Sequence, residues 1–170
     1  MTYRNLTRVE RTLVNRAFDR WGVFDFFKDK SLLIQENGTK KICLVPDWAE
    51  SILHLQPYLA GLIIGDLKKQ FVPSMAGAHL FSQLSKANEF HVHVNDNAEK
   101  LVIYGRDVMG ESITQASSLL NENELVILLN QKSEAIGIGR TRFAGKSIFQ
   151  KGRITITTIA DLGYYLREEG

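Results

Sequence analysis

The first regular pattern of apolar and polar positions along the chain is helical. Apolar residues recur at every fourth position and are expected to face a core: Val9, Leu13, Ala17 and Trp21. Thr7 precedes this stripe and Glu10 follows three residues later, which is the spacing of a capping box at a helix start. The pattern therefore predicts a helix that begins after Thr7 and ends near Trp21.

The next pattern is that of a β-hairpin. Two β-like runs, Leu32–Gln35 and Lys41–Val45, are joined through Asn37-Gly38. Asn-Gly is a strong hairpin signal because both residues tolerate a positive φ. Leu59–Leu67 reads as a short buried strand, and Ser74 as the N-cap of a helix that ends near residue 87. The front of the chain thus combines antiparallel strands with helices.

A polar, turn-forming break at Asn95–Asn97 predicts a domain boundary. Beyond it, Lys100–Tyr104 reads as a strand, Arg106–Ala116 as a short helix, and the all-apolar run Leu125–Leu129 as a strand in a barrel wall. The prediction is an α+β fold. It has an N-terminal α/β domain at 1–95, with antiparallel strands and helices, and a small C-terminal β-barrel with short helices at 96–170.

Two β-patterned runs, Ala135–Phe143 and Arg153–Ile159, form the most informative part of the chain. In the second run alternate residues fall on opposite faces. Ile154 and Ile156 would point inward, and the opposite face would carry Arg153, Thr155 and Thr157. A last short helix is expected from residue 161 to 167, with its apolar side chains inward: Leu162, Tyr165 and Leu166.

The first of these runs poses a geometric problem. Arg140 and Arg142 share strand parity with Ile136 and Ile138, so a regular strand would place all four side chains on one face. Glycine inside a strand often marks a bulge or a bend. A kink within Gly137–Gly139 would turn the arginines away from the isoleucines.

A local stripe of positive charge covers the same stretch. Five basic residues and no acidic one lie between positions 140 and 153, whereas the whole chain carries only +2. A basic stripe on one face is the electrostatic footprint of a polyanion site, and arginine also stacks on unpaired bases. The alternative is an ordinary solvated surface. The candidate RNA-binding residues are Arg140, Arg142, Lys146, Lys151, Arg153, Arg106 and Thr155.

The end of the chain resembles a PUA domain, the small RNA-binding β-barrel of pseudouridine synthases and archaeosine transglycosylases. The resemblance lies in AIGIGRTRF, KGRITITTI and ADLGYYLREE, and upstream in the run NAEKLVIYGRDV. With a front half of about 95 residues and nothing else, the chain is similar to the Nip-seven family of large-subunit ribosome-biogenesis factors, which pair a pre-PUA domain with a PUA domain.

That resemblance implies a non-catalytic role in maturing large-subunit ribosomal RNA. The PUA domain would bind single-stranded pre-rRNA, with uridine-rich strands as candidates, in a groove between the Arg106–Ala116 segment and the late strands. The front domain would dock ribosome-assembly proteins, with a Shwachman–Diamond-type factor as a candidate. We also expect a monomer. Front-half RNA contacts are less expected, because Pro73–Ala78 is not the basic segment found in such families.

Composition and the absence of known motifs argue against several other classes of protein. The chain has no apolar run long enough for a membrane span and no signal segment, so we expect a cytoplasmic protein, or a nuclear one in a eukaryote. Cys43 stands alone and is expected to be a small buried hydrophobe. No phosphate loop, dinucleotide fingerprint or nucleophile motif is present, and we expect neither an enzyme nor a cofactor.

Several alternatives stay open at this point. His91 and His93 share one strand face and have the spacing of zinc ligands, but no third ligand is indicated, so we expect an exposed or interdomain pair. The arginines of the first helix offer a second surface for RNA or protein. The protein is alternatively an interaction adaptor whose basic stripe meets an acidic protein, or the RNA-binding accessory subunit of an RNA-modification enzyme.

Overall fold

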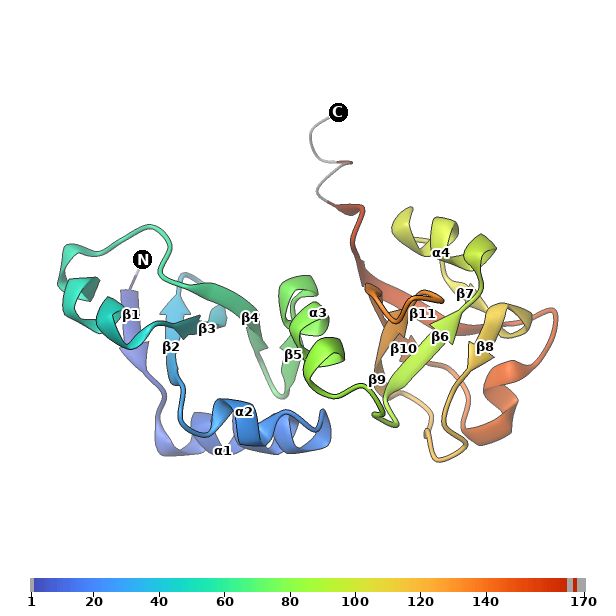
Figure 1. The fold of residues 1–170 in the computed structure, drawn as a ribbon, viewed down its shortest axis with the longest axis horizontal. Helices are drawn as coiled ribbons and strands as arrows, with labels where there is room; N and C mark the ends of the chain where they lie inside the picture. The colour runs from blue at the N-terminus through green and yellow to red at the C-terminus, as the bar shows by residue number, and fades with distance from the viewer. Residues whose placement is uncertain (1, 165–166, 168–170) are drawn as a thin grey trace. The chain divides into compact units, whose positions relative to one another are not determined.

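The computed structural model describes residues 2–164 and residue 167, and it divides the chain into two compact units. The first unit is Met1–Leu84 and the second is Ser85–Gly170. Each unit has its own β-sheet (Figure 1). The division precedes the Asn95 break because β6 (His91–Val94) pairs with strands of the second sheet. The sequence placed this strand in the front domain.

The first unit contains a five-stranded antiparallel sheet in the order β1-β2-β3-β4-β5. Its strands are β1 (Thr2–Asn5), β2 (Ser31–Glu36), β3 (Lys40–Val45), β4 (Leu62–Leu67) and β5 (Phe71–Pro73). The predicted hairpin is confirmed as β2 and β3, and Gly38 in its turn has a φ of +70°. Cys43 is buried in β3 as predicted, and this burial raises the pKa of its thiol to about 11.

The helices of the first unit are α1 (Arg8–Arg20), α2 (Phe24–Phe27), the 3-10 helix η1 (Asp47–Leu55) and α3 (Met75–Leu84). The capping box of α1 is confirmed. The Glu10 amide donates to Thr7 Oγ1 at 3.3 Å, and the Thr7 amide donates to Glu10 Oε2 at 2.9 Å. Ser74 caps α3 as predicted, accepting from the Gly77 amide at 3.0 Å.

The buried face of α1 differs from the predicted stripe. Val9 is 70% exposed, whereas Val14 and Phe18 are fully buried. The aromatic cluster sets this orientation, because the Phe18 ring stacks on Phe27 with centroids 4.3 Å apart. Edge-to-face contacts of Phe18 with Phe71 and Phe81 complete the cluster. The predicted stripe is therefore only partly right: Trp21 is buried as expected, but Val14 and Phe18 rather than Val9 form the buried face of the helix.

A buried carboxylate ties α1 to the sheet. Glu10 accepts two hydrogen bonds from the Arg4 guanidinium, at 2.8 and 2.9 Å, and one from Lys40 Nζ at 2.8 Å. Arg4 lies in β1 and Lys40 in β3, so the carboxylate joins three elements. The hydrogen bonds from Arg4 lower the pKa of Glu10 far below its usual value.

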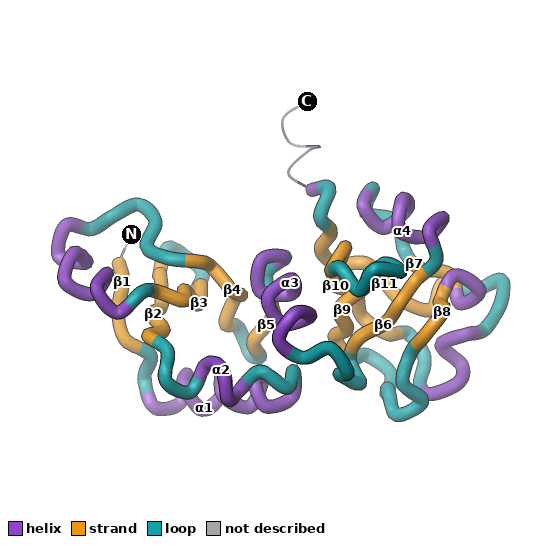
Figure 2. The backbone as a smooth tube through the Cα atoms, in the orientation of Figure 1, coloured by secondary structure: helices purple, strands orange, loops and turns teal. Residues whose placement is uncertain are grey.

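The second unit contains a curled six-stranded sheet in the order β7-β11-β10-β9-β6-β8. Its elements after β6 are α4 (Asp96–Ile103), β7 (Val108–Met109), η2 (Gly110–Ser112), β8 (Ile113–Gln115), β9 (Leu125–Leu129), β10 (Ala135–Thr141), η3 (Gly145–Phe149) and β11 (Ile154–Asp161). All pairs are antiparallel except β6 with β9. The tube in Figure 2 shows α4 beside these strands, and it contacts β7, β10 and β11.

Two predictions for this unit are wrong. The run Lys100–Tyr104 is not a strand but the last turn and C-cap of α4, because Asn95 caps a helix by accepting from the Ala98 amide at 2.9 Å. Arg106–Ala116 is not a helix but contains β7, η2 and β8. The helix α4 ends at Ile103 with Tyr104 as its C-cap, and Gly105 follows with a φ of +75°.

The remaining predictions for this unit are confirmed in part. The buried strand Leu125–Leu129 is confirmed as β9. In the final segment Leu162 is exposed rather than inward, and Tyr165 and Leu166 lie outside the described residues. No helix among the residues described is long and apolar enough to span a membrane.

The Glu10 cluster gives a stability prediction. Glu10→Gln should lower the free energy of unfolding of the first unit by about 2 kcal/mol at neutral pH, since hydrogen bonds to charged groups are lost in a buried site. Because the folded-state pKa is lowered, the carboxylate stabilises fully above its ordinary pKa of about 4.3, and this stabilisation falls as the pH drops below it. The difference between wild type and variant should therefore shrink in acid.

Denaturant titration followed by tryptophan fluorescence measures this effect, because both tryptophans, Trp21 and Trp48, lie in the first unit. Glu36→Gln is the matched control. It removes another carboxylate bound to Arg4, but one whose side chain is 41% exposed, so we expect a loss below about 1 kcal/mol. Equal losses in the two variants would contradict the assignment.

Candidate nucleic-acid interface

Two register shifts border the interface in β10. Pairing with β11 shifts between Ile138 and Gly139, where Ile159 of β11 has no partner, and pairing with β9 shifts between Ala135 and Gly137, where Ile136 has none. From Gly137 to Arg140 the pairing with β9 is continuous, so the predicted kink does not separate Ile138 from Arg140. Ile138 is buried, whereas Arg140, next to the last residue of the strand, is half-buried. A Cβ on Gly139 would lie 2.4 Å from Ile156 Cγ2, so the strands approach closely there.

Arg140 is held by the loop before β9. Its Nη1 donates to the carbonyl of Asn123 at 2.9 Å and to Asn123 Oδ1 at 3.4 Å. Asn123 has a φ of +65°, a left-handed conformation that asparagine tolerates better than most residues. Within the described part of the chain, the Nε and Nη2 groups of Arg140 have no hydrogen-bond partner. One edge of the guanidinium is thus anchored and the rest remains available.

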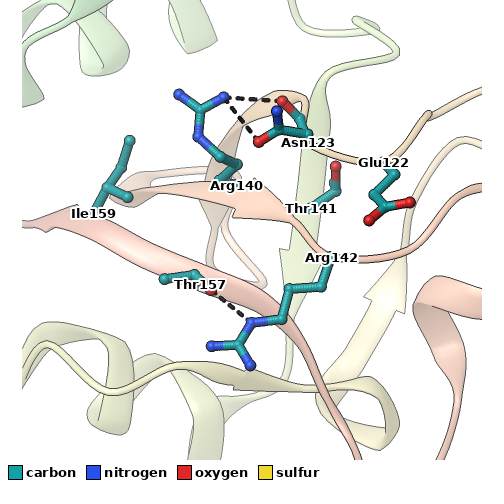
Figure 3. Close-up of a pocket in the computed structure, with 7 residues that line it drawn as sticks. All are labelled: Glu122, Asn123, Arg140, Thr141, Arg142, Thr157 and Ile159. Atoms are coloured by element: carbon teal, nitrogen blue, oxygen red, sulfur yellow. Dashed lines mark hydrogen bonds between the residues drawn. The ribbon is translucent and has the colours of Figure 1, made fainter.

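Arg142 is anchored on the other side of β10. Its Nε donates to Thr157 Oγ1 at 2.6 Å, and its Nη2 lies 3.1 Å from Asp107 Oδ2. The other oxygen of Asp107 accepts from the Thr158 amide at 2.9 Å, which fixes the carboxylate. Figure 3 shows the Arg140 and Arg142 side chains leaving the strand in different directions. Asp107 follows α4 in the chain and was not among the residues predicted from sequence.

Two hollows open along this surface and share Arg142. The first has a volume of about 400 Å³ and is lined by Glu122, Asn123, Arg140, Thr141, Arg142, Thr157 and Ile159. The second has a volume of about 500 Å³ and is lined by Met109, Arg142, Phe143, Gly152, Arg153 and Ile154. A continuous track of arginines therefore runs along β10 and the start of β11.

The predicted basic residues differ in how the structure places them. Arg153 lies over the Phe143 ring, with its guanidinium carbon 5.9 Å from the ring centroid. Lys146, in η3, and Lys151 are exposed but line neither hollow. Arg106 is also exposed and outside both hollows, and its carbonyl oxygen accepts from Thr158 Oγ1 at 2.9 Å. The structure thus groups three arginines, Arg140 in β10, Arg142 just after it and Arg153 just before β11, and leaves the lysines at the periphery.

Thr155 was predicted on the polar face of β11, and this is wrong. Its side chain is 0% exposed, and its hydroxyl has no hydrogen-bond partner within the described structure. The pairing of β11 with β7 shifts register between Ile154 and Ile156, which breaks the regular alternation. Ile154 consequently lies partly exposed beside Arg153. Thr157, one pleat further on, does reach the surface and binds Arg142.

The two histidines of β6 are not an exposed pair. His91 is 4% exposed, and neither ring nitrogen has a hydrogen-bond partner among the residues described. Burial lowers its pKa to about 4, with a smaller contribution from His93. His93 Nε2 lies 3.2 Å from Ser133 Oγ, and burial lowers its pKa as well. In residues 2–164 and 167 no group of three or more His, Cys, Asp or Glu side chains is placed to hold a metal ion.

Glu122 and Asp107 are the site residues that sequence reasoning missed. Between residues 140 and 153 the chain carries no acidic residue, and both carboxylates come from segments far from this run. The loop before β9 brings Glu122 to the first hollow, and the end of α4 brings Asp107 to Arg142. Only tertiary structure reveals that the basic stripe is interrupted by negative charge.

Comparison with known protein families agrees with this architecture. Residues 3–75 match the NIP7/UPF0113 pre-PUA domain, and residues 91–170 match the UPF0113 PUA domain. A UPF0113 protein of Archaeoglobus fulgidus is 28% identical over 172 residues, which cover 99% of this chain and 97% of the relative. A UPF0113 protein of Aeropyrum pernix is 30% identical over 114 residues, or 66% of this chain and 59% of the relative.

Solved structures show the same fold over the whole chain. A conserved PUA domain protein from Thermoplasma acidophilum is similar with a TM-score of 0.71 at 14% identity, covering 99% of both chains. A hypothetical protein from Pyrococcus horikoshii is similar with a TM-score of 0.72 at 17% identity, covering 98% of both chains. With both halves matched in the expected order, the chain belongs to the NIP7/UPF0113 family, as a pre-PUA domain followed by a PUA domain.

Proposed function

We propose that this protein is a non-catalytic RNA-binding factor whose PUA domain binds single-stranded RNA along β10 and β11. The observation that carries the proposal is the arginine track: Arg140, Arg142 and Arg153 line two adjoining hollows with Arg142 between them. Membership of a PUA-containing family supports RNA as the ligand. The exposed lysines at positions 146 and 151 would extend the positive surface beyond the hollows.

The anchoring of each arginine suits a strand of unpaired nucleotides. Asn123 holds one edge of Arg140, and Thr157 with Asp107 holds Arg142, so these side chains lose little further conformational entropy when RNA binds. Free guanidinium groups contact phosphates or stack on splayed bases. Phosphate contacts position an RNA without reading its sequence. Uridine-rich strands are a reasonable first probe because they stack weakly and leave their bases accessible.

We further propose that the RNA is pre-rRNA of the large ribosomal subunit and that the pre-PUA domain docks a ribosome-assembly protein, with a Shwachman–Diamond-type factor as one candidate. Support comes from the NIP7 pre-PUA match and from exposed aromatic and aliphatic side chains in and after η1, among them Trp48, Leu55 and Tyr58. Large exposed apolar groups in one segment are typical of a protein interface. Under this proposal the protein acts as a cytoplasmic or nucleolar monomer until it joins an assembling particle.

A purely binding role also fits the chemistry of the two hollows. Their lining includes no Cys, His or Ser that a neighbouring base would activate. Arg142 is paired with a carboxylate rather than placed beside a nucleophile. A binding function requires only the cations and the shape that the surface presents.

Salt-dependent RNA binding tests the proposal. We expect labelled oligouridine to bind with log K falling against log salt at about 0.7 per phosphate neutralised. Arg140→Ala/Arg142→Ala and Lys151→Ala/Arg153→Ala should each weaken binding and flatten the slope by about one to one and a half units. Fluorescence anisotropy over a salt series measures both quantities.

The matched control is Arg8→Ala/Arg11→Ala, which removes the same charge from exposed positions of α1 in the other domain. It should leave both affinity and slope unchanged. The proposal is contradicted when the wild type binds no RNA, or when the α1 variant loses as much affinity as the β10 variant. The first outcome would favour a protein-interaction adaptor, and the second would move the RNA site to α1.

The buried position of Thr155 gives an independent prediction. Thr155→Val removes a hydroxyl that has no partner in the described structure and keeps the side-chain volume, so stability should be unchanged or rise by up to about 1 kcal/mol. RNA affinity should also stay as in the wild type. Thermal unfolding and anisotropy test the two expectations. A marked loss of RNA affinity without a loss of stability would return Thr155 to the binding surface.

A further inference from the structure

The second hollow contains apolar side chains that phosphate binding does not use. Three of its lining side chains are apolar: Met109, Phe143 and Ile154. Ile154 is 37% exposed, and Met109 and Phe143 are half-buried. Phosphate oxygens bind to N–H and O–H donors, so a surface built only for an RNA backbone gains nothing from these groups. They also distinguish this hollow from the first one, whose described lining is polar except for Ile159.

Strand pairing places these apolar side chains on one surface. Met109 of β7 lies directly opposite Ile154 of β11, and opposite residues of an antiparallel pair share a face. Phe143 comes two residues after β10, which is the strand on the other side of β11. The Arg142 amide donates to the Thr155 carbonyl at 2.8 Å, and this bond keeps the chain after β10 beside the start of β11. The apolar surface is thus built on three neighbouring strands and their ends.

Two arginines border this apolar surface. The guanidinium carbon of Arg153 lies 5.9 Å from the centroid of the Phe143 ring, and Arg142 is held by Thr157 and Asp107. Within the described structure, the Arg153 side chain has no hydrogen bond or ion pair, and Nη1 of Arg142 has no partner. These N–H donors are free to bind phosphate groups beside a ligand that covers the apolar side chains.

The backbone around Arg153 is fixed before any ligand binds. The Arg153 carbonyl accepts from the Gly110 amide at 3.0 Å. The preceding residue is also held, because the Gly152 amide donates to Glu111 Oε2 at 3.0 Å. A surface that is already ordered in the free protein loses little conformational entropy when a ligand binds.

A matching ligand has a flat apolar face with negative charge on both sides of it. An unpaired nucleotide within an RNA strand has this form, because its base carries a π-face and a phosphate group lies on each side of its sugar. The hollow has a volume of about 500 Å³, which lies within the range for small-molecule sites and leaves room for one base.

We propose that the second hollow is a stacking site for one unpaired RNA base, with Arg142 and Arg153 binding the phosphates on either side of that base. Stacking accepts any base, since every base has a π-face. The contact is not ionic, so added salt should leave its contribution nearly unchanged, unlike that of the arginines. The inference rests on the proposed RNA-binding function and adds to it one base-binding position.

Removing the bases from the RNA tests the inference on the wild-type protein. The probes are labelled oligouridine, oligocytidine of the same length, and a strand of the same length and charge whose nucleotides are abasic. We expect the two pyrimidine strands to bind within about twofold of each other. The abasic strand should bind about fivefold to tenfold more weakly, at the low end for stacking on an aromatic side chain because pyrimidine rings are small. Fluorescence anisotropy measures the three affinities.

Phe143→Leu separates stacking from phosphate binding. Leucine keeps an apolar side chain but removes the ring, so affinity for oligouridine should fall about fivefold at every salt concentration, with the salt slope unchanged. Affinity for the abasic strand should stay as in the wild type. Phe143→Tyr keeps the ring and should bind all three strands as the wild type does. Phe149→Leu is the matched control, because it removes an exposed phenylalanine ring of η3 outside both hollows, and it should change no affinity.

The possible failures are distinguishable. Equal wild-type affinity for oligouridine and the abasic strand overturns the stacking site and leaves the proposed RNA-binding function standing. The same conclusion follows when Phe143→Leu binds oligouridine as tightly as the wild type, loses as much affinity for the abasic strand, or flattens the salt slope through a displaced Arg153. An equal loss in Phe149→Leu also overturns the assignment. Failure of the wild type to bind any of the three strands overturns both proposals and favours a protein ligand.

Discussion

The β10 strand has to serve the core and the surface at once, and β11 approaches it closely at Gly139. Ile136 and Ile138 are buried, yet Arg140 two residues later lies at the surface. In a regular strand these side chains would share one face. Pairing with β9 is continuous from Gly137 to Arg140, so the two side chains differ in exposure because of their places along the strand: Arg140 is next to the last residue of β10. At Gly139 the contact with Ile156 leaves room only for glycine. The arginine track therefore begins where β10 ends.

The same surface illustrates how a cationic site is built in a protein with little net charge. Each arginine is positioned by a different kind of contact: backbone and amide oxygens for Arg140, a carboxylate and a hydroxyl for Arg142, and an aromatic ring for Arg153. These contacts hold the side chains in place before any ligand arrives. Because the chain carries only +2 overall, attraction for RNA must arise from this local arrangement rather than from a long-range field.

Elements encoded by adjacent residues were predictable from the sequence. The capping box at Thr7, the Asn37-Gly38 hairpin and the apolar strand Leu125–Leu129 each depend on chemistry within a few positions. The buried face of α1 was predicted wrongly because a tertiary contact sets it. The stacking of Phe18 on Phe27 decides which side of the helix faces the core. Sequence periodicity alone favoured the four apolar residues from Val9 to Trp21 over the stripe that begins with Glu10.

The errors in the second domain have related causes. The run Lys100–Tyr104 is apolar enough for a strand, but the Asn95 side chain, which accepts from the Ala98 amide, caps a helix there. The prediction that Thr155 is exposed was wrong because side chains alternate between faces only in regular strands, and β11 shifts register beside this residue. Asp107 and Glu122 are brought to the arginines by loops and a helix end distant in sequence. Basic residues could thus be nominated from their pattern, whereas their partners required the fold.

Nuclear magnetic resonance mapping of the RNA contact surface tests the central claim most directly. The measurement follows backbone amide shifts while unlabelled single-stranded RNA is added to the isotope-labelled protein. The account predicts that the largest changes cluster at residues 122–123, 139–142 and 153–158, with the pre-PUA domain nearly unaffected. Changes concentrated on α1 or on residues 47–62, or no changes at saturating RNA, would contradict it.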